Sequence, residues 1–94
     1  MSTSDHPKAY RLAQRAIAEL KASVALLLAN APADGLTNAT IGRMLGIYAG
    51  HVGHVGHIPR TLLALMENEG VVTQGEGSKK WRLRSSDSPE PEEP

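Results

Sequence analysis

The sequence contains no cysteine, which excludes several kinds of protein. Disulfide frameworks, thiol nucleophiles and zinc sites built on thiolates all need this residue, so apolar packing alone must hold the fold together. No apolar run approaches the roughly 20 residues that span a bilayer, and no signal-peptide core follows the polar first residues. We therefore expect no membrane association and a cytoplasmic location, with the nucleoid as the expected place in a bacterium.

The common sequence patterns of catalysis are also missing. The chain has no glycine-rich phosphate loop of the Walker kind, no serine in a nucleophile-elbow setting and no close pair of catalytic carboxylates. A chain of 94 residues buries only a modest part of its surface, which argues against a deep pocket. We expect one compact domain that is not an enzyme and holds no cofactor.

The charges are unevenly distributed along a chain that is formally neutral at pH 7. All ten lysines and arginines precede residue 85, together with six acidic residues, so residues 1–84 carry a formal charge of +4. The other four acidic residues lie in 85–94, a segment that we expect to be disordered because it is rich in serine, proline and acids. A mildly basic domain with an acidic tail is compatible with a polyanionic partner.

We expect residues 1–6 to be disordered and residues 7–31 to form one long amphipathic helix. Pro7 suits the first turn of a helix, where its missing N–H costs nothing. At about 1.5 Å per residue the helix would be about 36 Å long, which exceeds what the remaining domain needs to cover it. The excess length predicts a contact with a partner. Apolar residues recur along it at spacings of three and four, as Tyr10, Ala13, Ile17, Leu20, Val24, Leu27, Leu28 and Ala31.

A short second helix is predicted over residues 38–46. Thr37 or Asn38 supplies an N-cap side chain, and Gly46 suits the left-handed residue that ends a helix. Its expected buried residues are Ile41, Met44 and Leu45.

A third helix is predicted over residues 58–69, after an irregular connection over 47–57 that glycines and histidines keep out of regular structure. Pro59 marks the first turn of this helix, and Gly70 is its stop signal. Its apolar positions are Leu62, Leu63, Leu65 and Met66. Its expected exposed residues are Arg60, Thr61, Ala64, Glu67 and Asn68.

A β-hairpin is predicted over residues 71–84. The first strand has β-propensity over 71–74, a glycine-rich turn follows, and polar and apolar residues then alternate over 79–84. Because side chains alternate across a strand, Trp81 and Leu83 should point to the core while Lys80, Arg82 and Arg84 face water. Residues 7–84 therefore read as one α+β domain, mainly α.

The order of these elements resembles the winged helix-turn-helix domain of bacterial transcriptional regulators. The segment 35–47 is similar to the first helix of that motif, and 62–72 is similar to the end of a recognition helix that runs into the first wing strand. The resemblance covers roughly residues 35–84. The sequence departs from the family at 48–58, where a glycine- and histidine-rich segment replaces a turn of a few residues.

This resemblance implies binding to double-stranded DNA. The recognition helix of the family enters the major groove by its N-terminal half, which places Arg60 at the base edges, where a guanidinium can bond O6 and N7 of guanine together. Basic residues of the wing would contact phosphate or the minor groove, and their counterion release makes affinity depend on salt. The residues expected at the DNA are Thr40, Arg43, His54, His57, Arg60, Thr61, Lys79, Lys80 and Arg82.

Other interpretations stay open at this point. The basic hairpin residues are also typical of a solvated, solubilising face, and winged helices also serve as protein-docking modules without direct DNA contact. His51, His54 and His57 have a spacing that suits zinc, but the intervening glycines disfavour the helix that would gather them, and no acidic residue lies nearby. We therefore expect no metal and assign these histidines to capping, packing or phosphate contacts.

A homodimer is expected through the long N-terminal helix. A single winged helix reads only a short site, so specific binding usually requires two copies on a two-fold site. Several alanines along the helix are small enough for close approach of a second helix, namely Ala9, Ala13, Ala16, Ala18, Ala22, Ala25 and Ala29. The sequence names neither an operator nor a small-molecule effector.

Overall fold

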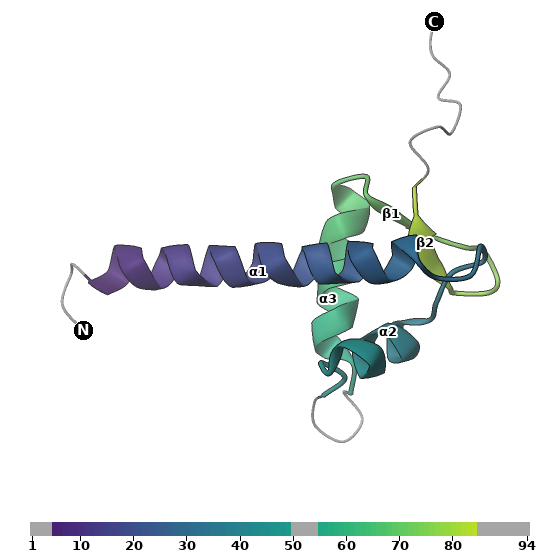
Figure 1. Cartoon of the computed structure of the whole chain (residues 1–94), viewed down its shortest axis with the longest axis horizontal. Coiled ribbons are helices and arrows are strands. Elements are labelled where there is room, and N and C mark those ends of the chain that lie inside the picture. The colour runs from purple at the N-terminus through teal and green to yellow at the C-terminus, as the bar shows by residue number, and fades with distance from the viewer. Residues whose placement is uncertain (1–4, 50–54, 85–94) are drawn as a thin grey trace, which may run out of the picture.

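The computed structural model describes residues 5–49 and 55–84, which form three helices followed by a two-stranded antiparallel sheet. The fold is mainly helical, and the long α1 runs across α3, with α2 and the hairpin at one end (Figure 1). Predicted features of residues 1–4, 50–54 and 85–94, His51 and His54 included, lie outside the described residues. The elements are α1 (Asp5–Ala29), α2 (Asn38–Leu45), α3 (His57–Asn68), β1 (Val72–Gln74) and β2 (Trp81–Leu83).

The first helix is covered over only half of its length. Its C-terminal half buries Val24 and Leu28 in the core, while every side chain over residues 5–16 is exposed. The helix begins two residues earlier than predicted, at Asp5, whose negative charge suits the first turn. Tyr10 continues the predicted apolar stripe, but it is 61% exposed on the segment that extends past the other elements.

The second helix is bounded as its local sequence predicts. The Thr37 side chain accepts a hydrogen bond from the Thr40 backbone N–H at 3.2 Å, and Gly46 adopts a left-handed φ of 75°. Ile41 is fully buried, but Met44 is 60% exposed and its predicted burial is wrong. The buried face of this short helix runs through Ile41 and Gly42, so Met44 falls at its outer edge.

The third helix supplies the largest share of the core. Pro59, in its first turn, is buried, and Leu65 is partly exposed rather than enclosed. All five residues predicted to be exposed on this helix are exposed. The core consists of Val24, Leu28, Ile41, Leu62, Leu63, Met66, Val72 and Trp81.

The hairpin is joined to the loop that follows α1. Trp81 is buried, as its strand phase predicts, and pairs with Gln74 across the sheet. On its other side, the Leu36 N–H donates to the Trp81 carbonyl at 2.9 Å and the Trp81 N–H donates to the Leu36 carbonyl at 2.7 Å. A β-carbon on Gly35, whose φ is +92°, would lie 2.1 Å from the Trp81 carbonyl oxygen. Only glycine fits this approach.

Candidate functional site

A polar groove of about 560 Å³ lies between the start of α2, the start of α3 and the hairpin. Segments that are distant in the sequence contribute its walls, so no single motif encodes it. Arg60 comes from the first turns of α3, and Lys79 comes from the hairpin loop. The lining residues are Thr37, Asn38, Ala39, Tyr48, Arg60, Gln74, Ser78 and Lys79.

Lys79 is held in an unusual backbone conformation at this groove. Its φ of 59° makes it the one non-glycine residue with positive φ among the described residues. The hairpin loop fixes the conformation, because the Lys79 N–H donates to the Gly75 carbonyl at 3.2 Å and the Gln74 side-chain amide donates to the Lys79 carbonyl at 3.1 Å. A left-handed lysine costs on the order of 1–3 kcal/mol, and such strain clusters at functional sites.

Close packing of α2 on α3 builds the opposite wall. A β-carbon on Gly42 would lie 2.9 Å from both the Pro59 ring and the Tyr48 side chain, so the two helices approach through a glycine. The Arg43 guanidinium stacks over the Tyr48 ring at 4.7 Å from the ring centre. This stacking fixes a cation beside the groove.

Asn38 links the start of α2 to the start of α3. Its side-chain amide donates a hydrogen bond to the Gly56 carbonyl at 3.3 Å. Its Oδ1 atom is buried and accepts no hydrogen bond from the described residues. A β-carbon on Gly56 would lie 2.8 Å from the Tyr48 ring, so this wall tolerates little change of shape.

Ion pairs separate the cations into two groups. Lys80 binds Asp34 at 2.9 Å, and its hydrogen bond and positive charge lower the pKa of that carboxyl. Lys21 and Glu69 pair at 2.6 Å, and Arg15 contacts Glu19 at 3.5 Å. The cations that form no ion pair with another described residue include Arg43, Arg60, Lys79, Arg82 and Arg84.

The predicted DNA contacts divide between two surfaces. Arg60 and Lys79 line the polar groove together, and Arg43 lies beside it on Tyr48. Thr40 is half-buried in the cap of α2, where its hydroxyl accepts from Thr37 at 3.0 Å. Arg82 is exposed on β2.

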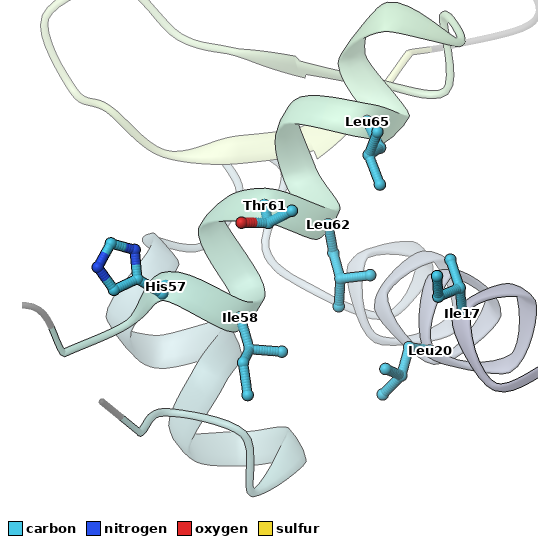
Figure 2. Close-up of a pocket in the computed structure, with 7 residues that line it drawn as sticks. All are labelled: Ile17, Leu20, His57, Ile58, Thr61, Leu62 and Leu65. Carbon is cyan, nitrogen blue, oxygen red and sulfur yellow. The ribbon is translucent and has the colours of Figure 1, made fainter. Parts of the chain in front are cut away.

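His57 and Thr61 instead lie at a second groove, apolar and about 280 Å³ in volume, between α1 and α3. Figure 2 shows Ile17 and Leu20 of α1 facing Leu62 and Ile58 of α3, while the His57 ring points away from α1. No local pattern predicts this groove, because its two walls are 37 or more residues apart along the chain.

Sequence reasoning missed several residues of the polar groove. The sequence predicts Asn38 only as a cap and Tyr48 only as part of the irregular connection, yet both line the groove. Gln74 and Ser78 carry no pattern that distinguishes them from ordinary hairpin residues. Their place in the site follows from the tertiary approach of the hairpin to α2.

Neither a metal centre nor a membrane span is found in the part of the chain that the structure describes. No group of three histidine, cysteine, aspartate or glutamate side chains is placed there to hold an ion. Among the helices of residues 5–49 and 55–84, none is long and apolar enough to cross a membrane.

No family model matches the chain, and no curated protein or solved structure matches it. Its function must therefore be inferred from its own grooves and charges.

Proposed function

We propose that this chain is a winged-helix protein that binds double-stranded DNA through the polar groove and acts as a transcriptional regulator. One observation carries the proposal: the groove brings Arg60 of α3 and Lys79 of the hairpin to one surface. In this proposal Arg60 reads a base edge and Lys79 contacts a phosphate.

The arrangement of elements supports the winged-helix assignment. The helices and the hairpin follow in the order of that fold, and the Leu36 bridge adds a third pairing segment beside β2. A helix with its side chains is about 10–12 Å across, which matches the roughly 12 Å width of the major groove of B-DNA. The exposed residues Arg60, Ala64, Glu67 and Asn68 lie on the face of α3 that would enter it.

The charges supply the affinity in this proposal. Arg43, Lys79, Arg82 and Arg84 are not neutralised by another described residue, so they are available to displace counterions from phosphates. Four phosphate contacts would give a slope of about −3 to −4 for log affinity against log salt, since each phosphate contributes about −0.9.

Fluorescence anisotropy of a labelled random-sequence duplex pool tests the proposal. Lys79→Gln should weaken binding and make the salt slope shallower by about one unit, whereas Arg60→Gln should weaken binding with little change of slope. Lys8→Gln is the matched control, because Lys8 is an exposed cation on the first turns of α1, remote from the groove. A salt-independent affinity, or an equal loss in Lys8→Gln, would contradict binding at the groove.

A role in protein docking without DNA contact is the competing function. Under that alternative, Arg60→Gln and Lys79→Gln leave duplex affinity unchanged. Selection from a random duplex pool then enriches no sequence. Enrichment of a common sequence that needs Arg60 supports the regulator.

A further inference from the structure

The protruding segment of α1, residues 5–16, is a helix without tertiary support among the described residues. Every side chain in it is exposed. An isolated helix of this length is marginal in water, because nucleation is costly and tertiary packing provides most helical stability. A covering partner would supply that packing.

We propose that the chain forms a two-fold symmetric dimer in which the protruding segment of each copy lies in the apolar groove between α1 and α3 of the other. This proposal does not rest on DNA binding. The protruding segment of one copy occupies the apolar groove of the other copy, and the reverse holds for the second contact.

The apolar stripe of α1 continues from the core into the protruding segment. Val24 is fully buried, and positions three or four residues apart along the same face lead to Ile17, Ala13 and Tyr10. The same face of α1 is therefore buried in the C-terminal half of the helix and exposed in its N-terminal half. Tyr10 is 61% exposed on it, and large aromatic side chains are common anchors of interfaces.

The apolar groove begins where the protruding segment ends. Its α1 wall is Ile17 and Leu20, and its α3 wall includes Ile58, Leu62 and Leu65 (Figure 2). Ile58 is 44% exposed and Leu65 is 39% exposed, so the α3 wall still offers apolar surface to a partner.

The protruding segment lies directly beside the apolar groove on α1, and this favours a second copy of the chain as the occupant of the groove. A two-fold axis perpendicular to α1 places α1 of one copy antiparallel to α1 of the other. Each segment then continues past the end of its own core and along the partner's groove. The twelve residues of the segment span about 18 Å.

The buried area is sufficient for a stable pair. Half the lateral surface of a twelve-residue helix is on the order of 350 Å². Each copy contributes that strip and a similar area of groove, so the dimer buries on the order of 700 Å² per copy, close to the roughly 800 Å² of a typical stable complex.

The charges are compatible with this arrangement. Lys8, Arg11 and Arg15 line a separate hollow together with Leu12, on the side of α1 opposite the stripe. They stay in water in the dimer and do not oppose each other. Arg60 lies on the other flank of α3 from Ile58, so the polar groove stays open in the dimer.

Sedimentation equilibrium of the full chain without DNA, from micromolar to millimolar concentration, tests the dimer. The expected mass is twice the 10.0 kDa of one chain. Tyr10→Glu and Leu65→Lys should each weaken dimerisation at least about tenfold, because each buries an unpaired charge. Leu12→Glu is the matched control: Leu12 is 65% exposed on the same segment but outside the stripe, so the dimer should persist.

Mixing the two variants distinguishes the reciprocal contact from a simple α1 to α1 contact. A heterodimer of the Tyr10→Glu and Leu65→Lys chains has one unchanged contact and one contact that pairs glutamate with lysine. It should therefore form where each variant alone is monomeric. A monomeric parent chain, dissociation by Leu12→Glu, or a dimer unaffected by Leu65→Lys overturns the proposal. Unchanged far-ultraviolet circular dichroism shows that each variant is folded.

Discussion

The approach of Gly35 to Trp81 makes the sharpest stability prediction. Gly35→Ala would place a β-carbon 2.1 Å from the Trp81 carbonyl oxygen and 2.7 Å from its carbon, where backbone must move. Gly46→Ala is the matched control, because Gly46 also has a positive φ, of 75°, but its added β-carbon would meet nothing within 4 Å. Both variants put alanine at a positive φ, but only in Gly35→Ala does the new β-carbon collide with the Trp81 backbone.

The structure sets how much free energy of unfolding each of the two variants should lose. A left-handed alanine costs about 1–2 kcal/mol, so Gly46→Ala should lower the free energy of unfolding by about 1 kcal/mol after the gain from a stiffer unfolded chain. In Gly35→Ala the collision also breaks the two hydrogen bonds between Leu36 and Trp81. Each contributes about 0.5–1.5 kcal/mol, so the total loss should be about 3 kcal/mol.

Urea unfolding followed by far-ultraviolet circular dichroism measures the difference. A loss of 1 kcal/mol lowers Tm by about 4–8 °C in a domain of this size, so thermal melts should separate the two variants clearly. Equal losses in Gly35→Ala and Gly46→Ala would refute the close backbone contact. A changed urea m-value would mean that the unfolded state, not the contact, had changed.

Three further predictions concern Lys79, Asp34 and Leu63. Lys79→Gly should raise the free energy of unfolding by about 1 kcal/mol, because glycine relieves the left-handed strain, yet weaken duplex binding in the anisotropy assay; Lys79→Ala should weaken binding without gaining stability. The lowered pKa of Asp34 means that its pair with Lys80 adds stability above the ordinary value of 3.8 and loses it as the pH falls through the folded value. Thermal melts below about pH 4 should therefore show a flatter pH dependence in Asp34→Asn. Leu63→Ala should cost about 2–5 kcal/mol in urea unfolding, because Leu63 is fully buried; no loss would contradict its place in the core.

Local signals predicted the helix boundaries well. Thr37 caps α2 and Gly46 ends it, and each of these residues makes its capping hydrogen bonds with backbone groups of the same short helix. The helix bounds agree with the prediction to within two residues. Periodicity was a weaker guide to burial, because a stripe on a helix does not say how much of it is covered. Tyr10 is therefore exposed although it continues the face that buries Val24.

The candidate site was predictable only in part. Arg60 and Lys79 were found from their types and their place at a helix start and a hairpin, and the structure brings them to one groove. Thr61 is exposed as predicted, but the crossing of α1 over α3 places it on the apolar flank. The pair of Lys80 with Asp34 joins positions 46 residues apart, which no local pattern encodes.

The Leu36 bridge has a mechanical consequence. Only a short turn separates the end of α1 from Leu36, and two hydrogen bonds then clamp Leu36 to Trp81. The helix α1 is buried at Val24 and Leu28 and exposed over residues 5–16, so a force on its exposed half would turn it about the core. We expect the two hydrogen bonds between Leu36 and Trp81 to pass part of such a tilt to β2.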